Sequence, residues 1–411
     1  MHILMFPQYR YPTGNAMLEA VFSQHLPDLG HRVSWIMSPQ TNGLATDSPI
    51  PWNRSSVYLV PGTGHDGPVR PASVASRMLQ RLRLAESIHR TNHVDIIHVR
   101  NELSSGLIGR YLRRRWKIPL VFQLSFPLSG KEEMASIALR ETGTNRSEVL
   151  IRLKRRVQTD ILRRADLVLA ISEEMKTSLV QQGIPRERVL SFPMGFDTQV
   201  EPRRYDGTKV RVRFELENAP VVLYFGALDR IRRIEFLFGV IERVRRFVPS
   251  VKLLLLGAAT DPSDESWLRS LVTAKGLGKT AVFCGAVERA EVPHFLAAAS
   301  LSVSPIPPIP AYLVSSPTKL FESLGMGVPV VANDEIREHR EVLGESQGGR
   351  CVPYEEEAFA DAIVDLLAHP ECSREAGQRG REYVLRNRSY SGLSELIERE
   401  YLALRNGAKG R

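Results

Sequence analysis

Short, continuous apolar runs that alternate with longer helical stretches are the feature that most constrains this chain. Runs such as 221–226 and 252–257 are apolar at nearly every position. A strand with one solvated face would alternate in polarity, so continuous runs indicate strands that are covered on both faces, as in parallel sheets. The pattern occurs as two series, and the sequence therefore predicts two doubly wound α/β domains.

The two series follow one another along the 411 residues. In the first, strands are expected at 2–6, 32–37, 57–60, 94–99, 120–124 and 167–171, with helices at 15–29, 74–90 and 147–164. In the second, strands are expected at 221–226, 252–257, 281–284, 301–304 and 329–332, with helices at 234–247 and 264–275. A polar stretch at 198–219 separates the series. We therefore place domains at 1–200 and 201–388 and a closing helix within 389–411.

The composition excludes several classes of protein. No apolar run reaches the roughly 18 residues that a membrane span needs. The strand-like start lacks the basic leader and long apolar stretch of a signal peptide. Cys284, Cys351 and Cys372 are far apart and odd in number, which is typical of reduced thiols in a cytosolic protein. We therefore expect a cytoplasmic protein.

All of the excess positive charge lies in the first half. Residues 1–200 have 26 lysines and arginines against 17 acidic residues, whereas the remainder has 29 of each. The helix expected at 147–164 has six basic residues around an apolar stripe of Leu150, Leu153, Val157 and Ile161. Such a helix fits an anionic membrane surface, and it equally fits a solvated face above an ordinary core stripe. Nucleic acid is not expected as a partner, because aromatic residues do not interleave with the basic ones.

The segment SSPTKLFESLGMGVPVVAN at 315–333 is the strongest candidate for a ligand site. Ser316 is a good N-cap and Pro317 suits the first helical turn, so a helix is expected to begin there. The free N–H groups and the positive dipole end of a helix start suit a phosphate, and Lys319 adds a cation. On local physics alone, an ordinary helix-loop-strand connection explains the segment as well.

Two other segments follow strand ends. Gly226 closes an apolar run and precedes arginines at 230–233, whose forked guanidinium groups match phosphate oxygens. A solvated basic loop is the alternative there, and spacing does not choose among the arginines. The turn at Gly14 and Asn15 opens a helix after the first strand, where backbone could approach a ligand, although it is no dinucleotide fingerprint.

Metal chemistry is not expected, because no His, Cys, Asp or Glu set has metal-ligand spacing. His98 follows a strand and is either a core residue or a residue at the edge of a cleft.

Several longer pieces of sequence carry a resemblance to a known family: Gly30–Val33, Asp95–His98, Ala165–Ser172, Pro193–Asp197, Tyr224–Leu228, Phe283–Val287, Leu296–Ala299 and Gly325–Ala332. Together they resemble the retaining glycosyltransferases of family 4, which have the GT-B fold of two facing Rossmann-like domains. The resemblance covers almost the whole chain. The form Ser-Pro-x-Lys-x-x-Glu at 316–322 is similar to the branch that builds bacterial surface polysaccharides and lipid-linked saccharides.

The resemblance implies roles for both domains. Residues 1–200 would bind the acceptor, residues 201–388 would bind the nucleotide sugar, and the closing helix would pack back on the first domain. Glu322 would hold the donor ribose, while Lys319 and Arg232 would stabilise the leaving diphosphate. The other implied donor contacts are Gly14, Asn15, Gly226, Arg230, Val287 beside the base, and the backbone of Ser316, Pro317 and Thr318.

Three positions depart from the family pattern. Val314 stands where the first of two paired glutamates is expected, Ala227 where an arginine follows the strand-end glycine, and Ser125 where a histidine is usual. Arg230 is a candidate replacement for that arginine. His98 and Ser125 are placed in the acceptor or sugar cleft. Because the residues replaced at Val314 and Ser125 normally contact the transferred sugar, its identity stays open.

The expected activity is hexosyl transfer from a nucleoside diphosphate sugar, a UDP- or GDP-sugar, to a lipid-linked or phosphate-bearing saccharide. No cofactor is expected. The resemblance implies retention of configuration and metal-independent catalysis through helix dipole and cations. The positive first half predicts docking at the inner face of a membrane. A sugar-nucleotide 2-epimerase and a catalytically silent binding subunit of the same fold are the alternatives, and the oligomeric state stays open.

Overall fold

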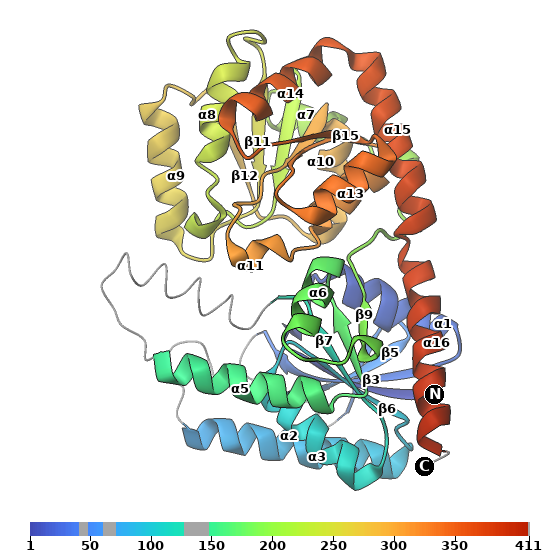
Figure 1. Cartoon of the computed structure of the whole chain (residues 1–411). Helices are drawn as coiled ribbons and strands as arrows, with labels where there is room; N and C mark the ends of the chain where they lie inside the picture. Colours follow the sequence, from blue (N-terminus) through green and yellow to red (C-terminus); the bar gives the residue numbers. More distant parts are fainter. Residues whose placement is uncertain (41–47, 61–70, 127–147, 410–411) are drawn as a thin grey trace. The chain divides into compact units, whose positions relative to one another are not determined.

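The computed structural model describes residues 1–40, 48–60, 71–126 and 148–409 and divides the chain into two compact units (Figure 1). Unit 1 is Met1–Pro193 with Tyr390–Arg411, and unit 2 is Met194–Ser389. The chain enters unit 2 before the expected boundary at residue 200, because Met194 and Phe196 already bind inside unit 2. The Met194 N–H donates to Ser316 Oγ at 2.9 Å, and a Cβ on Gly325 would lie 2.4 Å from the Phe196 ring.

The sheet of unit 1 has nine strands in its described part, in the order β4-β5-β3-β1-β6-β7-β8-β9 with β2 beside β3. They are β1 (His2–Pro7), β2 (Arg10–Tyr11), β3 (Arg32–Pro39), β4 (Ile50–Trp52), β5 (Ser55–Leu59), β6 (Ile96–Arg100), β7 (Leu120–Leu124), β8 (Leu167–Ala170) and β9 (Val189–Ser191). β4 pairs with β5 antiparallel, and the other printed pairs are parallel. The central strands β1, β6 and β7 are buried at every position, as continuous apolar runs predict.

Helices cover this sheet on both sides. They are η1 (Leu18–His25), α1 (Leu26–Asp28), α2 (Pro71–Thr91), α3 (Leu103–Trp116), α5 (Glu148–Arg164), α6 (Glu173–Gln181), the short η2 (Arg186–Arg188) and α16 (Tyr390–Lys409). α3 packs against α2 and α5, whereas α16 packs against η1 and α1 (Figure 1).

The closing helix α16 belongs to unit 1 through buried polar contacts as well as apolar ones. Tyr401 is fully buried, and its hydroxyl lies 2.5 Å from His98 Nδ1 of β6. Nearer the start of the helix, Glu398 Oε1 pairs with His31 Nε2 at 2.8 Å. The helix therefore supplies a buried hydrogen-bond partner to a strand in the middle of the sheet.

Unit 2 has a six-stranded parallel sheet in the order β12-β11-β10-β13-β14-β15. Its strands are β10 (Val221–Phe225), β11 (Lys252–Leu256), β12 (Ala281–Gly285), β13 (Leu301–Ser304), β14 (Val330–Asn333) and β15 (Gly349–Val352). Its helices are η3 (Pro202–Arg204), α7 (Thr208–Arg213), η4 (Arg230–Arg232), α8 (Phe236–Val244), α9 (Pro262–Ala274), η5 (Arg289–Glu291), α10 (Val292–Ala298), α11 (Pro310–Leu313), α12 (Thr318–Gly325), α13 (Arg337–Ser346), α14 (Glu356–Ala368) and α15 (Pro370–Asn387). The two predicted doubly wound α/β domains are confirmed.

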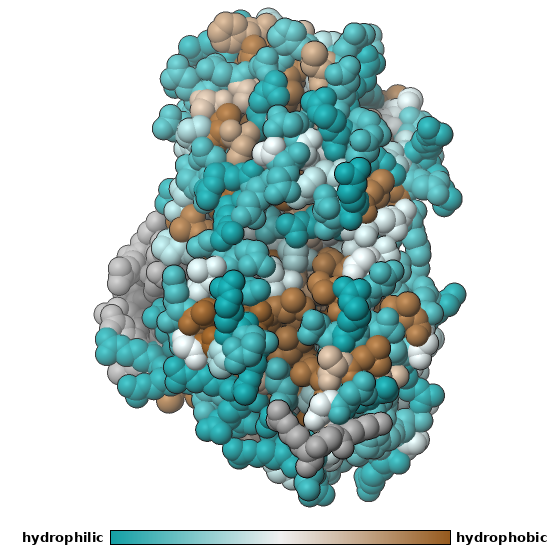
Figure 2. Space-filling view, turned by 45° about the vertical axis from the view of Figure 1, so that its right-hand side comes forward, coloured by the Kyte–Doolittle hydropathy of each residue, from teal (hydrophilic) through white to brown (hydrophobic). Residues whose placement is uncertain are grey.

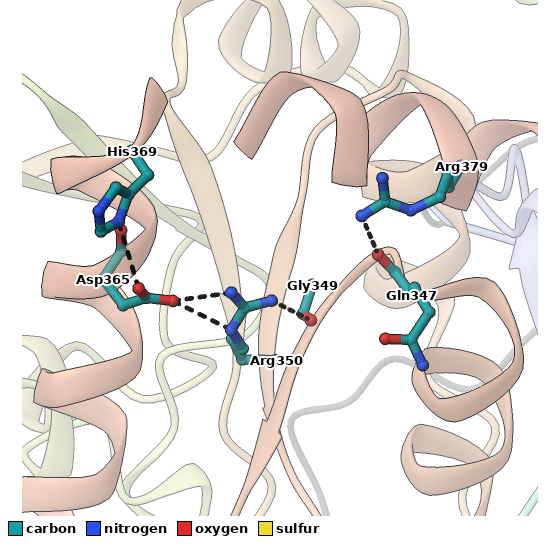
Figure 3. A network of polar contacts seen from close by, with 6 residues as sticks. All are labelled: Gln347, Gly349, Arg350, Asp365, His369 and Arg379. Atoms are coloured by element: carbon teal, nitrogen blue, oxygen red, sulfur yellow. Dashed lines mark hydrogen bonds and ion pairs between the residues drawn. The ribbon is translucent and has the colours of Figure 1, made fainter. Parts of the chain in front are cut away.

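Strands β9 and β15 are absent from the predicted elements because each is short and only partly buried. Exposed side chains tie β15 to its neighbours, as Figure 3 shows. Arg350 of β15 donates to Asp365 of α14 at 3.1 and 2.7 Å, and His369 Nδ1 lies 2.9 Å from the Asp365 carbonyl oxygen. Exposed ion pairs contribute only about 0–1 kcal/mol, so the parallel backbone pairing with β14 is the main restraint on β15.

Hydrophilic residues cover most of the face drawn in Figure 2, with apolar residues gathered in its lower part. Across the described ranges, no helix is both long and apolar enough to cross a membrane. All three cysteines are free thiols.

Replacement of Tyr401 by alanine is expected to lower the free energy of unfolding by about 3 kcal/mol, because it removes a buried ring and leaves His98 without its partner. Thermal or denaturant unfolding measures the change. Glu395→Ala, at an exposed position of the same helix, is the control and should change stability little. Equal stability of the two variants would contradict the assigned role of α16.

Candidate functional site

In unit 2 the strand order reverses between β10 and β13. Ligands of open α/β sheets bind outside the carboxyl ends of the strands at such a point. Gly226 follows β10 there, and the loop after β13 leads through α11 into α12. The order of the strands therefore places the residues expected to bind the donor, after β10 and after β13, at one edge of this sheet.

Helix α12 starts one position later than the N-cap prediction requires. Pro317 is the residue before the first turn, and it makes no side-chain cap. The prediction of Ser316 as N-cap is wrong, because its hydroxyl accepts from the Met194 N–H and holds the loop instead. Pro317 has no N–H to offer a ligand. The backbone donors left for an anion are the N–H groups of Thr318 and Lys319 in the first turn.

Lys319 is half-buried in the first turn of α12, with its Nζ 3.9 Å from the centre of the Tyr224 ring. Burial, and secondarily the charge of Arg232, lower the pKa of Lys319 to about 7. A Cβ at Gly226 would lie 3.7 Å from Nζ, an ordinary contact, so the φ of 139° and not the lysine is what favours glycine there. The lysine is therefore close to losing its proton unless an anion approaches.

Arg232, in η4, is a second cation held by an aromatic ring. Its guanidinium carbon lies 4.8 Å from the centre of the Tyr312 ring. Among the described residues, no carboxylate forms an ion pair with Arg232 or Lys319. Two neighbouring positive charges without a counter-ion repel each other, so this edge of the sheet favours a ligand with two negative charges.

Arg230 has contacts of a different kind. Its backbone N–H donates to Asp264 at 2.8 Å, and its guanidinium stacks on the ring of Trp267 at 4.4 Å. Both partners belong to α9. The structure therefore binds Arg230 to a carboxylate and an indole of α9, unlike Arg232.

Glu322 lies one turn after Lys319 in α12, with 15% of its side chain exposed. Its carboxylate pairs with Arg289 at 2.7 Å. Burial raises the pKa of Glu322, and the Arg289 charge opposes that rise. Arg289 stands two residues after Val287 in the loop that follows β12, so the pair ties the expected base-binding loop to α12.

The loop that carries Tyr312 is fixed by a buried amide. Asn333, at the end of β14, accepts from the Ile306 N–H at 2.8 Å and donates to the Ile306 carbonyl at 3.0 Å. His339 supports this arrangement with bonds to Ser304 and to the Asn333 carbonyl. The proline-rich segment after β13 is thereby held at one end, which sets the start of α11.

In unit 1, Gly14 and Asn15 lie in the turn before η1. Asn15 Oδ1 accepts from the Leu18 N–H at 3.1 Å and so begins the helix, while its Nδ2 donates to the Tyr9 hydroxyl at 3.3 Å. Gly14 is exposed and has nothing within 4 Å of the place a Cβ would take. The turn thus leaves open space beside a polar side chain.

The placement of His98 in an acceptor or sugar cleft is wrong. The residue is fully buried within β6, where it contacts Phe22 and Tyr401. Burial, then the charge of Arg100, lower its pKa to about 3, so it is neutral and structural. Ser125, after β7, is half-buried, and its N–H donates to Asn101 Oδ1 at 2.8 Å.

Three contributors to the site escaped the sequence-based prediction: Tyr224, Tyr312 and Arg289. Tyr224 stands in an apolar run and resembles an ordinary core residue. Tyr312 and Arg289 lie in the short helices α11 and η5, and their partners are set only by folding. Within the described residues no group of three or more His, Cys, Asp or Glu side chains could hold a metal ion.

A diphosphate ligand is expected to bind with proton uptake, because it favours the charged form of Lys319 and raises its pKa above 7. Affinity should therefore fall as the pH rises above 7, by up to about tenfold per pH unit. Calorimetric titration of UDP between pH 7 and 9, in buffers of different ionisation enthalpy, measures the uptake.

The control compares two lysine variants. Lys319→Met should weaken binding and flatten its pH dependence, whereas Lys209→Met, at an exposed position, should leave both unchanged. Affinity in the wild-type chain that does not vary over this pH range would rule out the role given to Lys319.

Comparison with solved structures agrees with the two parallel-sheet units. The chain matches a sucrose-phosphate synthase from Thermosynechococcus elongatus with a TM-score of 0.76 at 20% identity, covering 98% of each chain. It matches the Anabaena protein HepE in complex with UDP-glucose with a TM-score of 0.74 at 18% identity, covering 98% of this chain and 100% of that one. Both belong to the GT-B class of folds.

Two curated relatives come from Mycolicibacterium smegmatis. The chain is 26% identical to an alpha-maltose-1-phosphate synthase over 58% of its own length and 63% of that protein. It is 26% identical to a GDP-mannose-dependent alpha-(1-6)-phosphatidylinositol monomannoside mannosyltransferase over 62% of its length and 65% of that protein. The matches thus span less than two thirds of these relatives.

Two family models divide the chain between them. The model for glycosyltransferase family 4 matches residues 20–200, and that for glycosyl transferases group 1 matches residues 219–369. Each match falls largely within one of the two compact units. With the two doubly wound sheets, these matches identify the chain as a member of glycosyltransferase family 4 with the GT-B fold.

Proposed function

We propose that this chain transfers a hexosyl group from a nucleoside diphosphate sugar to an acceptor, with the donor bound at the β10–β13 edge of unit 2. The observation that carries this is the pair of cations Lys319 and Arg232, held on aromatic rings with no carboxylate partner in the described part of the chain. A donor diphosphate supplies the negative charge that they lack.

The proposed donor site has a second element in Glu322. A carboxylate one turn into α12 can accept hydrogen bonds from the two ribose hydroxyls while the first-turn amides face the phosphates. Val287, half-buried on the loop beside Arg289, would lie against the base. The known complex of HepE with UDP-glucose supports a UDP-sugar as the first donor to test.

Catalysis in this proposal rests on stabilising the leaving group. Departure of a nucleoside diphosphate develops negative charge on its β-phosphate, and preorganised cations lower the energy of that transition state. Lys319, Arg232 and the α12 amides would supply the stabilisation without a divalent metal. Retention of configuration and a phosphate-bearing or lipid-linked saccharide acceptor are part of the proposal.

Glu322→Ala is expected to weaken UDP binding roughly 10- to 100-fold, because hydrogen bonds to a charged group are lost. A thermal-shift screen against UDP, GDP, ADP and dTDP measures the effect, since ligand binding raises apparent stability by mass action. Glu357→Ala, an exposed glutamate of α14, is the control. An unchanged shift in the Glu322 variant would refute the site.

A catalytically silent binding subunit is the second candidate, favoured by Val314 at the end of α11 and by Ala227 after β10. Release of nucleoside diphosphate from UDP- and GDP-sugars distinguishes the two functions. If the chain binds nucleotides tightly but releases no nucleoside diphosphate from any sugar donor, it is the silent subunit.

A membrane surface is the proposed location of the acceptor. Helix α5 exposes Arg152, Arg155 and Arg156 to solvent, together with Leu153, of which 55% is exposed. Of the two alternatives for this stripe, the core stripe does not hold at Leu153, whereas Ile161 further along α5 is buried. The side chain of Leu150 is outside the described residues. α3 packs against α5 and α2 against α3 (Figure 1), and these two helices expose Tyr111 and Leu79.

Flotation with liposomes tests this location. The wild-type chain is expected to float with vesicles rich in anionic lipid and to remain behind with neutral ones, because each basic residue near the surface contributes on the order of 1 kcal/mol. Replacing Arg152, Arg155 and Arg156 by glutamine should abolish flotation. Equal recovery with both vesicle types, or none with either, would contradict the proposal.

A further inference from the structure

Arg100 is a buried cation at the carboxyl edge of the unit 1 sheet. It is the last residue of β6, and only 1% of it is exposed. Its backbone pairs with Pro7 of β1 on one side and with Gln123 of β7 on the other. The residue therefore stands in the middle of the sheet, at the edge where ligands of open α/β sheets bind.

The contacts of the Arg100 side chain leave its charge uncompensated. One Nη atom lies 3.4 Å from Asn15 Oδ1, and the guanidinium carbon lies 5.4 Å from the centre of the Tyr9 ring. The buried Nε has no hydrogen-bond partner. Within the described ranges, no carboxylate forms an ion pair with this arginine.

Arg81 offers a comparison within the same unit. It is also buried, and its Nε, like that of Arg100, has no partner in the described structure, but its guanidinium pairs with Glu102 and donates to Ser105 at 2.9 Å. That arrangement is the usual one, because a buried charge is costly unless a counter-charge and hydrogen bonds surround it. In place of a carboxylate, Arg100 has an amide oxygen at 3.4 Å, the Tyr9 ring, and the nearby phenol groups of Tyr9 and Tyr390.

The arginine cannot relieve this cost by losing its proton. Burial lowers the pKa of Arg100, but a guanidinium stays charged under all ordinary conditions. The adjoining Gln123 is equally buried and lies within hydrogen-bonding reach of His98, so it brings no negative charge to Arg100. A buried guanidinium left without a counter-charge in the described residues is better explained by a ligand than by a contribution to stability.

The residues around the Arg100 guanidinium extend from the buried sheet to the surface of unit 1. Tyr9 and Asn15 are half-buried, and Gly14 beside them is exposed with open space around its Cα. The Tyr9 hydroxyl and the Asn15 amide are hydrogen-bonded to each other at 3.3 Å. An anion that enters beside Gly14 would meet polar groups before it reached the guanidinium.

We propose that Arg100 is the anchor of an anion subsite in unit 1 that takes the phosphate group of a small molecule, with Asn15 and Tyr9 at its entrance. A guanidinium fork presents parallel N–H groups that match phosphate oxygens. Identification of the bound molecule as the phosphate-bearing glycosyl acceptor rests on the proposed function. The subsite itself does not, because its residues all belong to unit 1.

The first test measures stability without ligand. Arg100→Met keeps the aliphatic stem and removes the uncompensated charge, so its midpoint of thermal unfolding should rise in a buffer free of phosphate. Arg81→Met breaks a compensated pair, and its midpoint should fall. An Arg100→Met chain less stable than the wild type would mean that the fold already balances this charge, and it would overturn the proposal.

The second test measures binding with glucose 6-phosphate, inorganic phosphate, glucose and UDP as separate probes. In the wild-type chain both phosphates should raise the unfolding midpoint and glucose should not, and a larger shift with the ester identifies the phosphate as part of a sugar ligand. Arg100→Met should lose at least tenfold in affinity for the phosphates and keep its response to UDP. Arg100→Lys, which retains the charge, should keep part of the phosphate response.

Lys319→Met separates this subsite from the donor site. That variant should lose the UDP response and keep the response to glucose 6-phosphate. Phosphate binding that survives in Arg100→Met but disappears in Lys319→Met would place the anion in unit 2 and overturn the proposal. A wild-type chain that ignores UDP but responds to phosphate through Arg100 would contradict the proposed function alone.

Discussion

Two cations that rest on aromatic rings, with no carboxylate in an ion pair with either in the described chain, organise the candidate site of unit 2. Lys319 sits on Tyr224 and Arg232 on Tyr312. An aromatic face holds a cation weakly and without neutralising it, so the positive potential remains available to a ligand. That arrangement explains why a tyrosine interrupts the apolar strand β10 and why the loop before α11 is fixed so firmly by Asn333.

The same physical principle distinguishes structural from functional charges elsewhere in the chain. Arg81, Arg113 and Arg230 all have carboxylate partners, and these pairs tie neighbouring elements together. Arg100 is more deeply buried than any of them, and no carboxylate of the described residues pairs with it. His98, two residues earlier, is neutral because burial disfavours its charged form, and the Tyr401 hydroxyl contacts its Nδ1.

Much of the fold could be predicted because buried parallel strands have a local signature. The runs at β10 and β11 are apolar throughout, and the glycines and proline at 325–329 end a helix before the next strand. The N-cap prediction at Ser316 failed since its hydroxyl bonds to Met194, which is remote in the sequence. The placement of His98 in a cleft failed in a similar way, because its partner Tyr401 lies on the last helix.

The sequence by itself determined the two α/β units, the order of their elements and the cluster of Lys319, Glu322 and the arginines after β10, since periodicity and spacing are local properties. Only the tertiary structure decided which of these charges are compensated. It paired Arg230 with Asp264 and Glu322 with Arg289, and it left Lys319, Arg232 and Arg100 without a carboxylate partner in the described residues. Ion pairing depends on distances of a few ångströms between residues far apart in the chain, and no sequence pattern encodes those distances.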